Sequence, residues 1–208
     1  AQLSDCENAI VAGVNAMLIP RTLDSYAAAG LPSPTGKSFI LDAKADGFTR
    51  GEGCGAAVLR ASGSAEPHPR QVAGSAVRQD GRGASLTSPN GQAQQGLLVA
   101  ARSDASVPVD AGSLHEAHGT GTALGDPIEA GSLAAAILAN RSGGLALAFG
   151  GVKGNLGHGE STAGATGLIK LALGLRTGEG APNAQLRALN PHVGSALRGV
   201  RCALLAQC

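Results

Sequence analysis

Residues 113–139 read SLHEAHGTGTALGDPIEAGSLAAAILA, and this stretch decides the fold. It opens with a strand pattern at Ser113–Ala117, continues through a loop of glycine and threonine, and ends in an alanine-rich helix over Ile128–Ala139. The unit then repeats, because a strand pattern at Leu145–Phe149 leads into a glycine-rich loop and a helix from about Ser161. Strands that alternate with helices in this way predict an α/β fold whose sheet is largely buried.

Weaker patterns continue on both sides of this stretch. The last helix carries apolar residues at the i, i+3, i+4 and i+7 spacing of a packed face, namely Leu168, Leu171, Ala172 and Leu175. Further strands are predicted at Cys6–Val14, Ser38–Leu41, Gly55–Leu59 and Val72–Val77, and a further helix at Gln92–Arg102. The polar stretch Ala61–Pro69, which contains two prolines, is the best candidate for a domain boundary.

The composition is that of a globular chain with an unusual interior. The 208 residues are 43% hydrophobic and 15% charged, which is enough for a sizeable core in one domain or two small ones. Aromatic residues make up only 2%, and tryptophan is absent, so alanine, leucine, valine and glycine must fill the interior. We therefore expect a core in which backbones pack closely.

Charge, hydropathy and cysteine content exclude several functional classes. The net charge is +1 without a block of like charges, which indicates neither a nucleic-acid surface nor a membrane surface. No apolar run reaches about 18 residues, so no membrane span is expected, and no signal peptide is recognisable at the start. The four cysteines lack CxxC spacing and the density of a secreted scaffold. We interpret them as reduced thiols and expect a cytoplasmic location, although a lost targeting peptide would leave no trace.

The first candidate site follows the strand at Ser113–Ala117. His118 is succeeded by Gly119-Thr120-Gly121-Thr122, so the backbone there can approach a ligand closely while two hydroxyls are available for hydrogen bonds. Open α/β sheets bind their ligands at this end of a strand. A histidine in such a place can equally be an ordinary polar loop residue.

The second candidate site is the loop Gly150–Glu160, which contains Lys153 and His158. Lysine is scarce, with four against twelve arginines, so a lysine in a glycine-rich turn five residues before a histidine is notable. His158 precedes a predicted helix, whose positive end disfavours the protonated imidazole and favours anionic ligands. The alternatives are a solvated lysine and a capping histidine. A phosphate loop is excluded because the GxxxxGK[ST] pattern is absent.

The third unusual segment is DGFTRGEGCGAAVL at residues 46–59, whose glycines predict turns and close backbone contacts. Cys54 lies between two of these glycines at the start of a strand. A buried structural thiol is the more common role for a cysteine in such a place than a reactive one.

Together these segments resemble the motifs of β-ketoacyl synthase domains, closest to type I polyketide synthases. The matching blocks are His118-Gly-Thr-Gly-Thr, Gly-Asp-Pro-Ile-Glu129, Val-Lys153-Gly-Asn-Leu-Gly-His158 and Asp-Gly-Phe-Thr-Arg-Gly-Glu-Gly-Cys-Gly from residue 46. Two shorter blocks, Ala12-Gly-Val-Asn15 and Ser88-Pro-Asn-Gly91, occur in the family's order and at about its spacing. The resemblance covers essentially the whole chain, and several long blocks in order are a specific signal.

The resemblance implies an α/β fold of the thiolase-like type, a layered αβαβα core that this chain would represent incompletely at both ends. Residues 1–70 would be the end of the N-terminal ketosynthase half, and residues 71–208 most of the C-terminal half. The implied reaction is the decarboxylative Claisen condensation of polyketide and fatty-acid biosynthesis, in which an acyl thioester is joined to malonyl carrier protein.

The resemblance also assigns roles to individual residues. His118 and His158 would be the catalytic histidines, and we expect them to donate hydrogen bonds to an enolate oxygen. Lys153 would be the conserved lysine, paired with the acidic Glu129. Thr120 and Thr122 would contact the phosphopantetheine arm of an acyl carrier protein. We expect the two imidazoles and the lysine amine to converge within about 10 Å. Neither a metal nor a further cofactor is implied.

The main departure concerns the nucleophile. The family's catalytic cysteine lies in a TACSSS-like block, and none of Cys6, Cys54, Cys202 and Cys208 occupies such a motif. The closing GTNAH-type block is also missing. One hypothesis is therefore an acyltransferase segment that is inactive alone, and we expect an acyl carrier protein and a second copy as partners of the complete domain. The alternatives are a cysteine-less decarboxylase, and a non-catalytic scaffold or partner subunit.

Overall fold

The computed structural model describes residues 6–61, 70–81 and 88–206, and a three-stranded parallel sheet lies at its centre. The strand order is β3 (Leu114–Glu116), β4 (Leu147–Gly150) and β5 (Cys202–Leu204), so the middle strand is the second in the chain. Parallel neighbours end at the same edge of a sheet. The loops that follow β3 and β4 therefore start side by side.

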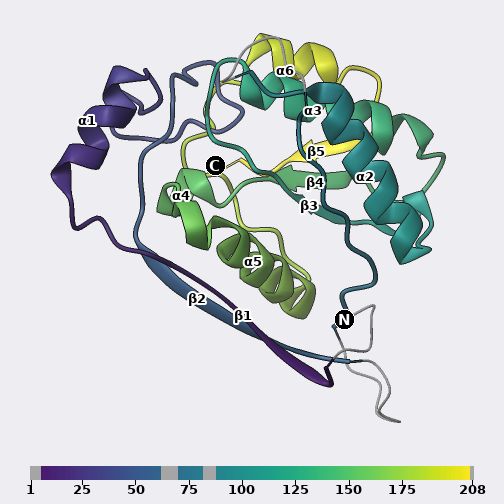
Figure 1. Cartoon of the computed structure of the whole chain (residues 1–208). Helices are drawn as coiled ribbons and strands as arrows, with labels where there is room; N and C mark the ends of the chain where they lie inside the picture. The colour runs from purple at the N-terminus through teal and green to yellow at the C-terminus, as the bar shows by residue number, and fades with distance from the viewer. Residues whose placement is uncertain (1–5, 62–69, 82–87, 207–208) are drawn as a thin grey trace.

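Helices cover both faces of this sheet (Figure 1). One face carries α2 (Gly91–Ala105), α3 (Gly125–Ala136) and α6 (Pro191–Ala196), which pack on one another through α3. The other face carries α4 (Lys153–Leu156) and α5 (Ala163–Thr177). Three short 3-10 helices complete the second half, namely Val109–Ala111, Leu138–Asn140 and Glu160–Thr162.

A second, antiparallel sheet lies beyond α5. It consists of β1 (Asn8–Asn15) and β2 (Gly53–Arg60), which pair along their whole length with Ile10 opposite Val58. The connection between them contains α1 (Pro20–Ala28). Figure 1 shows the resulting order of layers, from α2, α3 and α6 through the parallel sheet and α5 to the β1–β2 ribbon. Helix and sheet layers thus alternate as αβαβ, and the described residues do not form a fifth layer.

The apolar core lies between the parallel sheet and α3. Phe149 of β4 is completely buried there against a cluster of aliphatic side chains. Its main members are Ile40, Leu41, Leu133, Leu138, Leu147, Leu186 and Val193. The largest core members are thus a single phenylalanine and branched aliphatics, as the aromatic-poor composition requires.

On the other side of the molecule, glycine lets α5 and the 3-10 helix just before it (Glu160–Thr162) approach the antiparallel sheet closely. A side chain at Gly13 of β1 would collide with the carbonyl oxygen of Ser161, and one at Gly55 of β2 would come within 3.2 Å of the Ala165 side chain. These contacts confirm that backbones pack closely in this chain. They also make the position of α5 sensitive to the glycines that face it.

Most predicted elements are confirmed, with shifted ends, but two strands are wrong. Ser38–Leu41 is a turn rather than a strand, and it is apolar because Ile40 and Leu41 are buried in the core. Leu41 even takes a positive φ of 60° there, and its N–H donates to the Asp126 carboxylate at 2.7 Å. Val72–Val77 forms no strand, and Val77 is 97% exposed. The predicted boundary at Ala61–Pro69 falls almost entirely outside the described residues.

The predicted apolar face of the last helix is also wrong. Leu175 is 66% exposed and Leu168 is exposed as well, whereas the buried position of α5 is Gly167, which packs on the Glu116 side chain. The spacing failed because α5 is apolar on all sides, as expected for a helix that lies between two sheets. In the described part of the chain, no helix combines the length and the hydropathy of a membrane span.

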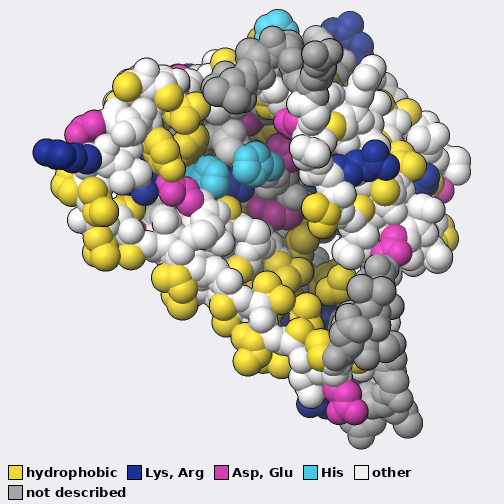
Figure 2. All heavy atoms as spheres, viewed as in Figure 1, with side chains coloured by type: hydrophobic (Ala, Val, Ile, Leu, Met, Phe, Trp, Pro, Cys, Tyr) yellow, Lys and Arg dark blue, Asp and Glu magenta, His cyan; other side chains and the backbone are white. Residues whose placement is uncertain are grey.

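The outer face of the β1–β2 ribbon is apolar and exposed. Ile10 is 76% exposed and Val58, its cross-strand neighbour, is 73% exposed, and both lie on the face that points away from α5. Figure 2 shows hydrophobic side chains along the lower edge of the molecule, where this ribbon and α5 lie. Apolar patches of this kind promote association.

We predict that residues 1–208, expressed alone, self-associate through this face. Changing both Ile10→Thr and Val58→Thr should lower light scattering while leaving the circular-dichroism spectrum unchanged, because threonine also favours strands. The control is Val77→Thr, which removes one exposed valine away from the ribbon. Equal scattering of the double variant and the control would show that the patch does not drive association.

Candidate active site

The site forms where the loops after β3 and β4 meet. Ala117, just past β3, donates its N–H to the carbonyl oxygen of Gly150 at the end of β4, at 2.8 Å. His118 follows at once, and Lys153 follows three residues after Gly150. The parallel register thus brings together two residues that are 35 positions apart.

His118 and His158 lie next to each other. Their ring centroids are 5.6 Å apart and the rings are nearly perpendicular, with an interplanar angle of 84°. Figure 2 shows histidine side chains side by side in a hollow on this face, with acidic and basic side chains behind them. The sequence-predicted histidines therefore share one site.

Lys153 completes the group. Its side chain is buried, and Nζ donates to the carbonyl oxygen of His118 at 2.5 Å. Burial lowers the pKa of Lys153, and the nearby carboxylates of Glu129, Glu116 and Asp126 oppose that shift. The lysine thus holds the backbone at His118 and places positive charge beside both rings.

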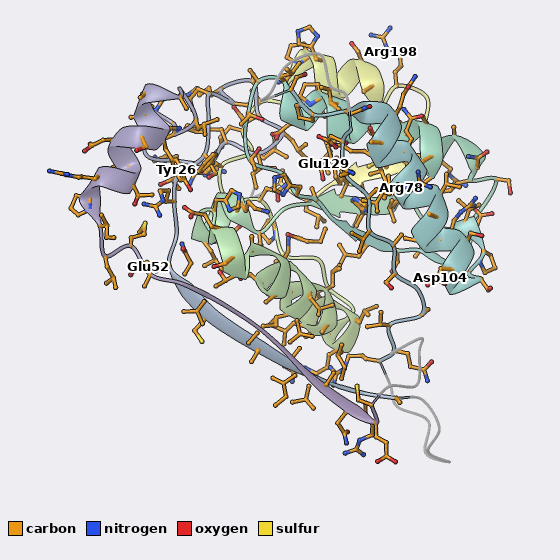
Figure 3. The ribbon with its side chains drawn as sticks, in the orientation of Figure 1. Tyr26, Glu52, Arg78, Asp104, Glu129 and Arg198 are labelled. Carbon is orange, nitrogen blue, oxygen red and sulfur yellow. The ribbon has the colours of Figure 1, made fainter. Side chains whose placement is uncertain are left out.

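Glu129 has a different partner from the one expected. Among the described residues, Glu129 and Lys153 do not form an ion pair. Instead, the Glu129 carboxylate accepts the N–H groups of His118 and Gly119, at 2.6 and 2.8 Å. Burial raises the pKa of Glu129, and these two N–H groups oppose the rise. Its central position in Figure 3 fits this role, which is to fix the loop that carries His118.

A hydrogen bond fixes the tautomer of His158. The Nδ1 atom accepts the N–H of Glu160 at 2.9 Å, so the proton of the neutral ring is on Nε2. Burial lowers the pKa of His158, Lys153 lowers it further, and only Glu160 opposes the shift. The ring is therefore a neutral N–H donor that presents Nε2.

The pKa of His118 is lowered by the same kinds of cause, to about 4. Removal of the ring from water is the main cause, followed by the charges of Lys153 and His158. The imidazole is therefore uncharged at neutral pH. Two neutral imidazoles beside a buried ammonium group make a site suited to negative charge.

The segment Phe48–Gly51 binds His158 through two backbone hydrogen bonds and one ring contact. Thr49 accepts the N–H of His158 at 2.7 Å, and Gly51 donates its N–H to the His158 carbonyl oxygen at 2.9 Å. The Phe48 ring lies 5.0 Å from the imidazole. The third unusual segment of the sequence thus belongs to the site through its backbone and its phenylalanine.

Thr120 and Thr122 lie in the same loop as His118. Their hydroxyl groups are 3.3 Å apart, and that of Thr122 accepts the N–H of Gly125 at the start of α3. Gly121 between them has a φ of +73°, and a side chain there would collide with the backbone of Phe39. The glycines therefore allow the tight loop that sets the two hydroxyls side by side.

Two carboxylates that shape the site, Asp126 and Glu116, were not predicted as site residues. The fully buried Asp126 accepts the N–H groups of Leu41 and Gly121, so it ties the turn at Leu41 to the threonine loop. Glu116 accepts the Val152 N–H at 2.6 Å and pairs with Lys170 of α5 at 2.7 Å. Asp126 lies inside a recognised block and Glu116 lies two residues before one, but a motif does not show which distant backbone a carboxylate binds.

None of the described cysteines faces the two histidines. Cys54 points to the outer face of β2, and Cys202 pairs with Leu147 at the end of the sheet away from the site. Burial raises the pKa of Cys202 to about 11, which leaves its thiol protonated at neutral pH. Cys6 is exposed ahead of β1, and Cys208 lies outside the described residues.

The described side chains suggest hydrogen-bond chemistry at this site. Two adjacent imidazoles lie beside a buried ammonium group, so negative charge placed against them can be stabilised. In the described ranges, no group of three or more histidine, cysteine or acidic side chains could hold a metal ion.

Family comparisons agree with this arrangement. The family model described as "Beta-ketoacyl synthase, C-terminal domain" matches residues 70–187, and "Beta-ketoacyl synthase, N-terminal domain" matches residues 2–65. A phenolphthiocerol/phthiocerol polyketide synthase of Mycobacterium tuberculosis is 44% identical over 193 residues, which are 91% of this chain and 10% of the relative. A highly reducing polyketide synthase of Cordyceps militaris is 41% identical, over 92% of this chain and 8% of its own length. The chain thus spans about a tenth of the length of these relatives.

Solved structures give the same result. An oxazolomycin ketosynthase domain of Streptomyces albus superposes with a TM-score of 0.91 at 33% identity, over 99% of this chain and 36% of that one. The ketosynthase from module 6 of the bacillaene synthase of Bacillus subtilis gives a TM-score of 0.90 at 29% identity, over 99% and 37%. The expected fold is confirmed: the chain belongs to the β-ketoacyl synthase family and shares the thiolase-like fold of polyketide synthase ketosynthase domains.

Proposed function

We propose that this chain supplies the enolate-stabilising half of a decarboxylating ketosynthase site. The observation that carries the proposal is the pair of neutral imidazoles, 5.6 Å apart, one of which has its Nε2–H tautomer fixed by a backbone N–H. Such a pair can donate two hydrogen bonds to one oxygen. The membership of the chain in the polyketide ketosynthase family supports a condensation as the overall reaction.

The chemistry that needs these donors is the loss of CO2 from a malonyl thioester. The bond between the α-carbon and the carboxylate breaks, CO2 leaves, and its electron pair forms an enolate whose charge lies on the thioester oxygen. Hydrogen bonds from His118 and His158 to that oxygen stabilise the developing charge, as in an oxyanion hole. The enolate carbon then attacks the carbonyl carbon of an acyl thioester, a carbon–carbon bond forms, and the C–S bond breaks so that the thiolate of that thioester leaves.

Lys153 and Glu129 would act on this step through His118. Lys153 binds the His118 carbonyl and Glu129 binds its N–H, so the peptide units on both sides of the imidazole are fixed. The buried ammonium group also disfavours protonation of both rings. We therefore assign Lys153 and Glu129 as positioning residues.

The substrates of a complete domain would arrive on the phosphopantetheine arm of an acyl carrier protein, without a further cofactor. The adjacent hydroxyls of Thr120 and Thr122 can bind the amide groups of such an arm. Relatives in this family are polyketide synthases, which supports a carrier protein and a second ketosynthase copy as partners.

The cysteine that carries the acyl group in the condensation would be a residue other than Cys6, Cys54 and Cys202. The second candidate function is a cysteine-less decarboxylase, because decarboxylation requires the two histidines but not a thiolate. A non-catalytic scaffold is less favoured, since it gives no reason for Lys153 to be buried beneath His118.

The first prediction from the proposed function concerns the two histidines in a complete ketosynthase domain that contains residues 1–208. His118→Ala or His158→Ala should lower the rate of malonyl decarboxylation about 100- to 1000-fold, the usual effect of removing an oxyanion donor. Acyl transfer to the cysteine, measured separately with labelled acyl thioester, should be affected less. His192→Ala is the control, because this exposed residue of α6 lies away from the site. Normal decarboxylation in either site variant would refute the role.

The second prediction concerns pH. Free histidine side chains titrate near pH 6.5, and the lowered pKa of His118 and His158 keeps both rings neutral below that value. The decarboxylation rate should stay level as pH falls through 6.5 and decline only at lower pH, where Nδ1 of His158 takes up a proton and loses the Glu160 N–H. The free energy of unfolding should also fall below pH 6.5, since the unfolded chain binds protons first. A decarboxylation rate that falls with a midpoint at pH 6.5 or higher would contradict the lowered pKa of the two histidines.

The third prediction is that residues 1–208 alone do not elongate an acyl thioester. The chain would be incubated with a radiolabelled acyl thioester and malonyl carrier protein, and both protein-bound label and β-keto product would be measured. We expect neither, because no described cysteine is placed to present a thiolate to the histidines. Stoichiometric labelling of one cysteine together with product would show that the nucleophile is in this chain.

A further inference from the structure

Three side chains from distant parts of the chain meet behind His158. Arg50 pairs with Glu160, with Nε 2.5 Å from Oε1, and the side chains are only 10% and 25% exposed. The Arg50 guanidinium also lies over the Tyr26 ring, 5.2 Å from its centroid. The Tyr26 hydroxyl donates to the other Glu160 oxygen at 3.4 Å, and Figure 3 shows Tyr26 on α1. Glu160 is thus held through both of its carboxylate oxygens.

The backbone of Glu160 is strained. Its φ is +46°, a conformation that costs a residue with a side chain free energy relative to glycine. This conformation directs the Glu160 N–H to Nδ1 of His158. Strain of this kind persists only where the surroundings impose it. The contacts of Arg50 and Tyr26 with the Glu160 carboxylate are side-chain interactions that can impose it.

We propose that Arg50 and Tyr26 hold Glu160 in its left-handed conformation and thereby fix His158 as an Nε2–H donor. This inference rests on the proposed function, in which His158 donates to the enolate oxygen. Arg50, Tyr26 and Glu160 are positioning residues, because they act on the reaction only through His158. Nothing in their contacts requires them to touch the substrate.

The aromatic contacts connect Tyr26 to the imidazole of His158 through Phe48. Tyr26 packs edge-on against Phe48 at 6.4 Å between centroids, and Phe48 packs against His158 at 5.0 Å. One side of the imidazole therefore rests on Phe48, and its Nδ1 is engaged by Glu160. The His118 ring packs edge-on against the same imidazole, with 5.6 Å between the centroids. With both supports in place, only Nε2 is left to donate to a ligand.

The test compares two substitutions of Glu160 in a complete ketosynthase domain that contains this chain. Both Glu160→Ala and Glu160→Gly remove the carboxylate, but only alanine retains a penalty for a positive φ, which is worth about tenfold in population. We expect malonyl decarboxylation to fall by about tenfold more in Glu160→Ala than in Glu160→Gly. A purely electrostatic role would make the two variants equal. A purely structural role would make glycine no better than alanine, because glycine makes the chain more flexible.

Arg50 provides a second, independent pair. Arg50→Met should lower the decarboxylation rate, and Arg50→Lys should restore part of it, because lysine keeps the charge but not the planar stacking on Tyr26. Arg21→Met is the matched control, since this exposed residue of α1 has no side-chain contact with Glu160. An Arg50→Met enzyme with the rate of the control would overturn the proposal.

The tautomer itself is measured by nitrogen NMR of ¹⁵N-histidine-labelled protein, with His158→Ala used to assign the signals. The wild type should show Nδ1 unprotonated and Nε2 protonated, and Glu160→Ala and Arg50→Met should show a mixture of tautomers. An unchanged tautomer in Glu160→Ala would refute the inference. If His158→Ala decarboxylates normally, the proposed role of His158 in catalysis fails, but this spectrum still decides whether Glu160 fixes its tautomer.

Discussion

Glu116 is the residue on which the geometry of the site depends. It ends β3, its Oε1 accepts the Val152 N–H just before α4, and its Oε2 pairs with Lys170 of α5. One buried carboxylate therefore joins a strand, the loop that carries Lys153, and the helix between the two sheets. A buried carboxylate that lost such partners would be costly, because an uncompensated charge in a protein interior is strongly unfavourable. The loops that bear His118 and His158 are arranged around this junction.

The electrostatics of the site follow from the burial of Lys153 beneath the exposed His118 and the half-buried His158. A buried lysine would ordinarily lose its charge, but three carboxylates nearby favour the ammonium form. Burial is the main cause that lowers the pKa of both imidazoles, and the charge of Lys153 lowers it further. Each carboxylate accepts at least one backbone N–H, so the charged groups are tied to the backbone in a connected network. The arrangement is ready for negative charge before a ligand arrives, which is the condition for electrostatic catalysis.

The sequence predicted the parts of this molecule that depend on local pattern. The strand, glycine loop and helix around His118 are confirmed because each residue type matches its local geometry. Ser38–Leu41 was mistaken for a strand, since a buried turn and a buried strand have the same apolar composition. The pairing of Arg50 with Glu160 spans 110 positions, and no periodicity records such a contact. The positive φ of Glu160 was not predictable either, because a glutamate in the sequence does not indicate a left-handed backbone as a glycine does.

The scarcity of aromatic residues has a practical consequence. The chain contains no tryptophan and a single tyrosine, and that tyrosine is Tyr26, which lies under a guanidinium group and donates to Glu160. Its ultraviolet emission therefore reports on one location, the support behind His158, without any label. Quenching by the carboxylate and the cation would make the signal sensitive to whether that support is assembled. These 208 residues thus carry an optical probe of the contacts around Glu160.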